Sequence, residues 1–196
     1  CVKGFDVDAS STAGHSRGRR KPAPGSHRRP EAAQAFLPKL YGALDLGTNN
    51  CRLLIATPGP QGFHVRDAFS RIVRLGEGLG ATGALGELAM KRTIEALRVC
   101  SNKLKWHKVD RHRLIATEAC GLASNGEQFI SRVAEETGLQ LEIIDRQTEA
   151  ALAASGADPL IEGEARDVLV FDIGGGSTEV MWIEQRDGER HILAWD

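Results

Sequence analysis

Two short stretches, each an Asp followed by a glycine-containing turn, hold the residues of this chain best suited to chemistry. One reads Asp45-Leu46-Gly47-Thr48-Asn49-Asn50, and the other reads Asp172-Ile173-Gly174-Gly175-Gly176-Ser177-Thr178-Glu179. Glycine-rich turns expose backbone N–H groups that suit phosphate oxygens. An Asp beside such a turn can hold a hydrated divalent cation against the same phosphates. The two stretches therefore predict a site that handles phosphate groups.

The spacing of the two stretches indicates a duplication. Subtracting 45 from 172, and 47 from 174, gives the same offset of 127 residues. Each stretch follows one apolar run and precedes another, which predicts strand, tight turn and strand in both places. We expect two related lobes that face one another, with the two turns meeting at a cleft.

The elements that must position these turns follow from hydrophobic periodicity. We expect strands over 41–46, 51–57, 63–74, 113–117 and 140–144, and helices over 85–106, about 126–137 and 147–156. The strand pattern restarts at Val168 after a charged loop at 161–167, with a hairpin turn at 186–189 and a strand over 190–195. The order β-β-β-α-β-α-β-α is thus followed by three opening strands of a second unit.

These elements predict three parts of the chain. Residues 1–36, dominated by Ser, Gly, Pro and basic residues, are expected to form a disordered basic tail. Electrostatic docking of this tail to polyphosphate, RNA or a membrane surface is an alternative role. Residues 37–156 are expected to form a first lobe, and residues 157–196 the beginning of a second, incomplete lobe.

Composition limits the class of protein. Residues 1–40 hold eight Lys/Arg and three Asp/Glu, whereas residues 41–196 hold seventeen and twenty-three, so the body is mildly acidic and a specific nucleic-acid partner is not expected. No run reaches the roughly 18 apolar residues of a membrane span, and the start lacks a secretory signal. The four cysteines lack paired spacing. We expect a cytoplasmic protein with reduced thiols and no membrane partner.

Five motifs resemble, in order, the exopolyphosphatase/guanosine pentaphosphate phosphohydrolase (Ppx/GppA) family. They are Tyr41-Gly42-Ala43-Leu44-Asp45-Leu46-Gly47-Thr48-Asn49, Arg74-Leu75-Gly76-Glu77-Gly78-Leu79, Ala116-Thr117-Glu118-Ala119-Cys120, Leu141-Glu142-Ile143-Ile144 with Glu149-Ala150, and Val170-Phe171-Asp172-Ile173-Gly174-Gly175-Gly176-Ser177-Thr178-Glu179. The resemblance implies the α/β actin-like ATPase (ribonuclease H-like) fold, with the first lobe complete and the second truncated after its opening strands. It implies Mg²⁺-dependent release of terminal phosphate from polyphosphate or guanosine pentaphosphate. A homodimer of the full-length form stays open.

The resemblance also assigns roles to single residues. Glu149 corresponds to the family's catalytic carboxylate, which orients and deprotonates the attacking water, and a carboxylate base suits such in-line attack. Glu179 resembles an acidic residue near the metal and the water, and Asp45 and Asp172 would hold Mg²⁺ directly or through water. The expected phosphate-binding residues are Gly47, Thr48, Asn49, Gly174, Gly175, Gly176, Ser177 and Thr178. Two further residues, Arg74 and Glu77, are weaker candidates.

Two positions depart from the family pattern. Gly121 and Ala151 stand where the family normally has arginine, whose planar fork binds phosphate through two parallel hydrogen bonds. Loss of one such contact in the transition state would slow turnover about 10- to 150-fold. Arg146 and Arg71 are the candidates to replace the lost charge.

Two alternatives to the hydrolase follow from these observations. A catalytically weakened protein would bind polyphosphate or guanosine polyphosphates and act as a sensor, with Gly121 and Ala151 as the reason. A kinase of the same fold would need an adenosine pocket built mostly by the second lobe.

Overall fold

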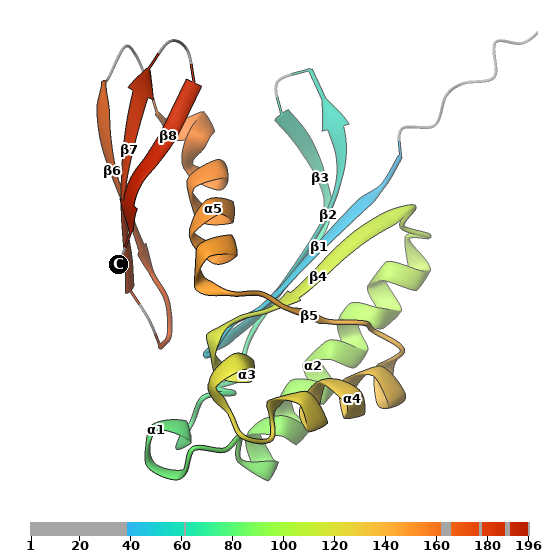
Figure 1. Ribbon diagram of the computed structural model, residues 1–196. Helices are drawn as coiled ribbons and strands as arrows, with labels where there is room; N and C mark the ends of the chain where they lie inside the picture. The colour runs from blue at the N-terminus through green and yellow to red at the C-terminus, as the bar shows by residue number, and fades with distance from the viewer. Residues whose placement is uncertain (1–38, 61, 162–165, 177, 187–188, 196) are drawn as a thin grey trace, which may run out of the picture. The chain divides into compact units, whose positions relative to one another are not determined.

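Two β-sheets, linked along the chain by helices, make up this computed structural model (Figure 1). The structure describes residues 39–60, 62–161, 166–176, 178–186 and 189–195. The expected basic tail at 1–36 lies outside these residues, as do positions 187 and 188 of the expected hairpin turn. Within the described residues, no helix combines the length and the apolar character that crossing a membrane requires.

The first sheet has five strands in the order β3-β2-β1-β4-β5. They are β1 (Tyr41–Leu46), β2 (Asn50–Gly59), β3 (Gly62–Ile72), β4 (Arg111–Ala116) and β5 (Glu142–Ile143). The helices that follow or separate them are α1 (Leu79–Thr82), α2 (Glu87–Trp106), α3 (Glu118–Leu122), α4 (Gly126–Thr137), α5 (Arg146–Ala157) and the 3₁₀ turn η1 (Asp158–Leu160). The second sheet is an antiparallel meander of β6 (Asp167–Ile173), β7 (Thr178–Arg186) and β8 (Glu189–Trp195).

The predicted order of strands and helices is confirmed, with corrections at four places. The short helices α1 and α3 were not predicted, since four or five residues give no helical periodicity. The strand expected over 140–144 is only Glu142–Ile143, because this edge strand pairs with β4 at two positions. The third strand ends at Ile72 instead of 74, because Arg74 adopts a left-handed backbone conformation with φ of 49°.

Strand alternation and parallel pairing bring distant motifs to one edge of the first sheet. In β1, Leu44 and Leu46 are buried in the core, and the pleat therefore turns Asp45 to the opposite face. β4 lies parallel to β1 with Ala116 opposite Leu46. Thr117 follows directly and donates its N–H to the Leu46 carbonyl at 3.1 Å. The first turn and the residues after β4 therefore share this edge.

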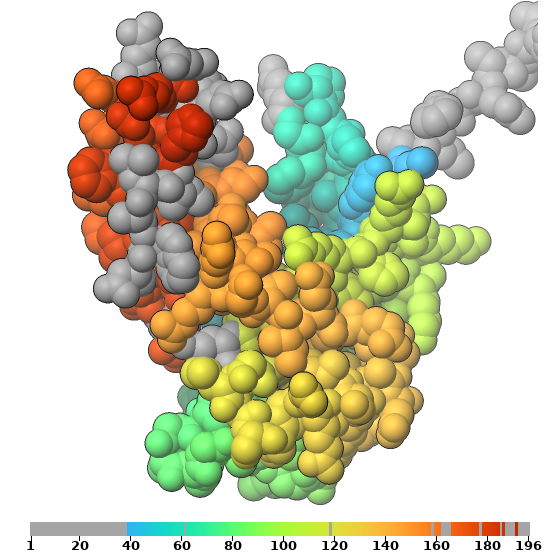
Figure 2. All heavy atoms as spheres, viewed as in Figure 1, coloured from blue at the N-terminus to red at the C-terminus, as the bar shows by residue number. Residues whose placement is uncertain are grey.

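Helices α2 and α4 bury their apolar faces with the sheet in one hydrophobic core. Figure 2 shows the side chains of α3 and α4 packed together on the viewed face, in agreement with their contacts. Phe129 of α4 is 1% exposed. The largest fully buried side chains are Phe129, Leu44, Leu46, Ile55, Leu75, Ile94, Leu97, Met181, Val73, Val133, Thr93 and Cys51.

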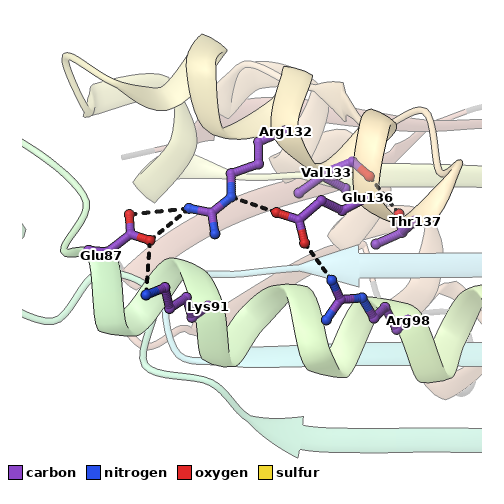
Figure 3. Close-up of polar contacts among 7 residues, drawn as sticks. All are labelled: Glu87, Lys91, Arg98, Arg132, Val133, Glu136 and Thr137. Atoms are coloured by element: carbon purple, nitrogen blue, oxygen red, sulfur yellow. Dashed lines mark hydrogen bonds and ion pairs between the residues drawn. The ribbon is translucent and has the colours of Figure 1, made fainter.

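A network of charged side chains ties the outer surfaces of α2 and α4 together (Figure 3). Arg132 of α4 donates to Glu87 of α2 at 2.9 Å and to Glu136 on its own helix at 2.7 Å. Glu136 also accepts from Arg98 of α2. These partly exposed pairs fix the helix pair with small individual contributions to stability.

A second polar cluster joins β3 to the last turns of α2. One carboxylate oxygen of Asp67 accepts from Lys103 Nζ at 2.7 Å and pairs with His107 Nε2 at 2.9 Å. These hydrogen bonds, from Lys103 first and His107 second, hold the pKa of the Asp67 carboxyl below its usual range.

Two thiols meet inside the core between β2 and α2. The sulfur atoms of Cys51 and Cys100 lie 3.9 Å apart, and neither residue has exposed surface. Cys120 of α3 is also buried as a free thiol.

Candidate active site

The first glycine turn joins β1 to β2 and is closed by its own backbone. Gly47 N–H donates to the Asn50 carbonyl at 2.9 Å, and the side chains of Thr48 and Asn49 are half-buried. Because β1 and β2 are antiparallel, Asp45 lies directly opposite Arg52. The predicted strand, tight turn and strand is confirmed here.

The second glycine turn joins β6 to β7 in the same way. Asp172 in β6 lies opposite Glu179 in β7. Subtracting 52 from 179 gives 127, so Arg52 and Glu179 occupy equivalent positions of the repeat. The cross-strand partner of Asp45 is therefore a cation, whereas that of Asp172 is another carboxylate.

The two turns approach one another so closely that only glycine fits at the contact. A Cβ atom placed on Gly175 would lie 2.3 Å from Cβ of Asn49. One placed on Gly176 would lie 2.9 Å from both Cγ2 and Oγ1 of Thr48. These distances are far below ordinary carbon contacts of about 3.5–4.0 Å. The predicted meeting of the turns is thus seen in the geometry.

A polar cavity of about 230 Å³ lies where the turns meet. It brings together eight of the predicted site residues with four that were not predicted. The predicted ones are Asp45, Gly47, Thr48, Asn49, Glu149, Asp172, Gly174 and Gly175. The additional ones are Asn50, Arg52, Thr117 and Ile173.

Three predicted site residues in the described part of the chain do not line this cavity. Gly176 lies against Thr48 at its border, and Thr178 is an exposed first residue of β7. Glu179 is buried, at 6% exposed. Ser177 lies outside the described residues.

The electrostatics of the cavity centre on Asp45. Burial raises the pKa of the Asp45 carboxyl, the nearby Arg52 guanidinium opposes that rise, and the charge of Asp172 adds to it. Asp45 and Asp172 are therefore close enough for their charges to interact. A cation placed between them would offset both the free-energy cost of burying the Asp45 charge and its repulsion from Asp172.

The acidic residues fit a hydrated Mg²⁺ better than an ion enclosed by protein. Among the described residues, no three His, Cys, Asp or Glu side chains come together closely enough to hold a metal ion. Mg²⁺ usually keeps several waters and binds through one or two carboxylates together with substrate phosphates. Asp45 and Asp172 could supply such carboxylates.

Glu149 lines the cavity because a capping hydrogen bond fixes where α5 begins. The carboxylate of Asp145 accepts the N–H of Thr148 at 2.7 Å, which caps the helix. The side-chain hydrogen bond with Thr148 and this backbone bond together hold the pKa of Asp145 below its usual range. Glu149 follows within the first turn, and its side chain is half-buried.

Neither of the two arginines predicted to replace the charge missing at Gly121 and Ala151 lies in the polar cavity. Gly121 on α3 and Ala151 on α5 are exposed. Arg71 places its guanidinium 5.3 Å above the ring of Phe69, and neither Arg71 nor Arg146 lines the polar cavity. The arginine that does line it is Arg52. Its position opposite Asp45 could have been found by extending the repeat from Glu179.

A larger cavity of about 580 Å³ adjoins the polar one but differs in chemistry. The two cavities share Asp45 and Arg52. The remaining lining is mostly apolar, with Leu54, Ile115 and Leu152 among its residues. Phosphate oxygens need hydrogen-bond donors, so the smaller cavity is the better candidate for phosphate chemistry.

Comparison with known proteins agrees with this geometry. The model of the Ppx/GppA phosphatase family matches residues 54–192. Exopolyphosphatase 2 of Mycobacterium tuberculosis is 36% identical over 161 residues, which cover 78% of this chain and 49% of that protein. The chain therefore spans about half the length of the curated relatives it matches.

Solved structures of the same family share the fold. A Ppx/GppA family member from Aquifex aeolicus superposes with a TM-score of 0.69 at 30% identity, covering 81% of this chain and 51% of that one. An exopolyphosphatase from Cytophaga hutchinsonii gives a TM-score of 0.71 at 30% identity, covering 81% and 49%. The α/β actin-like fold expected from the sequence is thus that of its structural relatives, and the chain belongs to the Ppx/GppA phosphatase family.

Proposed function

We propose that this chain carries the catalytic cavity of a Mg²⁺-dependent hydrolase that releases terminal phosphate from inorganic polyphosphate or guanosine pentaphosphate. The observation that carries the proposal is the polar cavity, in which Glu149 lies with both glycine turns and two Asp residues. The family supplies the class of reaction, since its members are phosphatases by name. Phosphate release measured separately from each substrate would distinguish polyphosphate from guanosine pentaphosphate.

In the proposed reaction the terminal phosphate lies on the backbone N–H groups and the Thr48 hydroxyl of the two turns. Arg52 contributes a permanent positive charge on the same cavity wall. Asp45 and Asp172 would hold Mg²⁺, which when bound neutralises phosphate charge. Donors fixed before the substrate arrives stabilise charge that develops in the transition state.

Glu149 acts as the base in this proposal. It orients a water in line with the anhydride bond and accepts its proton as the water oxygen bonds to phosphorus. The bond between phosphorus and the bridging oxygen breaks, and the substrate leaves with one phosphate fewer. A half-buried carboxylate is suited to this role, because it is partly shielded from bulk water.

Phosphate release tests the proposal directly. The full-length protein is incubated with Mg²⁺ and either long-chain polyphosphate or guanosine pentaphosphate, and released phosphate is measured. We expect release from at least one substrate and its loss in Glu149→Gln by a factor of about 100 or more. The matched control is Glu127→Gln, which changes an exposed Glu in the first turn of α4.

The outcomes separate the hydrolase from its rival. Release from one substrate alone names that substrate. Binding of either ligand without release would instead support the sensor role. Equal release by wild type and Glu149→Gln would remove Glu149 from the mechanism. We further propose a cytoplasmic location and, for the full-length form, a homodimer, to be checked by fractionation and light scattering.

A further inference from the structure

Arg92 on α2 binds one short segment of chain through three acceptors. Its Nε donates to the carbonyl of Val73. Its Nη2 donates to the carbonyl of Arg74 at 3.2 Å and to the Glu77 carboxylate at 3.0 Å. One guanidinium on α2 thus makes three hydrogen bonds to Val73–Glu77, the segment between β3 and α1, in addition to the core packing of Val73 and Leu75. The planar fork of arginine presents donors on two separate nitrogens to these acceptors, a geometry that the compact ammonium of lysine does not reproduce.

The same segment donates backbone hydrogen bonds to the first glycine turn. The N–H groups of Val73 and Arg74 both donate to the Asn49 carbonyl, at 2.8 and 3.0 Å. Gly76 N–H donates to the Thr48 carbonyl at 2.9 Å. A Cβ atom on Gly76 would lie 2.4 Å from Cγ2 of Thr48. The turn is therefore in tight contact with this segment as well as with the second glycine turn.

Arg74 links the two sets of bonds. Its backbone has a φ of 49°, a left-handed conformation that is unfavourable for a residue with a side chain. In this conformation its N–H reaches Asn49 while its carbonyl reaches Arg92. Such a conformation persists only when surrounding contacts hold it, and Arg92 supplies one of them.

We propose that Arg92 is a positioning residue for the phosphate-binding turn. It does not line the polar cavity. It fixes the segment Val73–Glu77, which sets where the Thr48 hydroxyl and the turn amides stand in the cavity. The proposal deepens the proposed function and rests on it, since the position of the turn matters to catalysis only if phosphate binds there.

The first test needs no substrate. Amide hydrogen exchange is measured by NMR in wild type, in Arg92→Lys and in the control Arg98→Lys. Arg98 lies on the same helix but pairs with Glu136 of α4. We expect the Val73 and Gly76 amides to exchange about 10-fold faster or more in Arg92→Lys, and as in wild type in Arg98→Lys. Unchanged protection in Arg92→Lys would overturn the proposal.

The second test follows the consequence for the reaction. We expect kcat/KM for phosphate release from tripolyphosphate with Mg²⁺ to fall about 10- to 100-fold in Arg92→Lys, because small displacements of positioning groups are costly. The melting temperature should fall by only a few degrees, and Arg98→Lys should stay within about twofold of wild type.

A double-mutant cycle separates positioning from general stability. Thr48→Val removes the hydroxyl that Arg92 is proposed to position. If Arg92 acts through the turn, Thr48→Val costs less in the Arg92→Lys background than in wild type. Additive losses would refute the proposal. A wild-type protein that releases no phosphate would refute the proposed function instead, while the exchange comparison would still decide whether Arg92 fixes the turn.

Discussion

Gly175→Ala is expected to disable the cavity by forcing the two glycine turns apart. The new Cβ would lie 2.3 Å from Cβ of Asn49, 3.1 Å from its backbone nitrogen and 3.3 Å from its Cα. Carbon atoms in contact rest about 3.5–4.0 Å apart, so the turns would have to separate by more than about 1 Å. Rotation of the Asn49 side chain cannot relieve the overlap, because all three atoms are fixed by the backbone.

The size of the effect follows from this displacement. A misplacement of about 1 Å can cost about 100-fold in rate, which corresponds to about 2.7 kcal/mol of transition-state stabilisation. We therefore expect kcat/KM for phosphate release to fall about 100-fold. Overpacking should also lower the free energy of unfolding by about 1–3 kcal/mol, without abolishing the fold.

Steady-state phosphate release from tripolyphosphate with Mg²⁺ gives the comparison, with thermal unfolding measured on the same samples. The matched control is Gly156→Ala on α5, where an added Cβ would meet no atom within 4 Å. Only the variant at position 175 should lose activity. If Gly175→Ala kept kcat/KM within about threefold of wild type, the close approach of the turns would not be what holds the phosphate.

Three further predictions concern charge, pH and packing. Gly121→Arg and Ala151→Arg occupy exposed positions and should each raise turnover about 10-fold if the new guanidinium reaches phosphate, as single-turnover rates would show. The pKa of Asp67 is lowered in the folded state, so its contribution to stability is present above pH of about 4 and is lost as the pH falls through the folded value. Asp67→Asn should accordingly cost about 1 kcal/mol at pH 7 in urea unfolding, with the difference from wild type vanishing in acid. Phe129→Ala should cost about 3–5 kcal/mol, also by urea unfolding, and a cost below about 1 kcal/mol would contradict its place in the core.

Local patterns in the sequence predicted the elements that build the site. The expected bounds of β1 and α4 match the structure, because β1 runs into a glycine turn and α4 is bounded by Gly126 and Gly138. The identical offset of the two Asp residues predicted that their turns would meet. These signals lie within a few residues of the feature they predict, or in a direct repeat.

The site features that could not be predicted from the sequence depend on contacts between segments that are distant along the chain. Thr117 joins the cavity because β4 pairs with β1 in a particular register, and Arg52 joins it because β2 folds back beside Asp45. The left-handed conformation of Arg74 depends on contacts with Asn49 and Arg92. No periodicity in the neighbouring residues carries information on such contacts.

The buried thiols of β2, α2 and α3 can report opening motions of the core. Cys51 and Cys100 have no exposed surface, and burial raises the pKa of Cys120 to about 12. A thiol reagent can therefore modify these residues only when β2, α2 or α3 opens, at a rate that measures the population of the open form. With Cys1 replaced by serine, the labelling rate of each thiol would show which of β2, α2 and α3 opens first, and ligands that bind the adjoining glycine turn should slow the labelling.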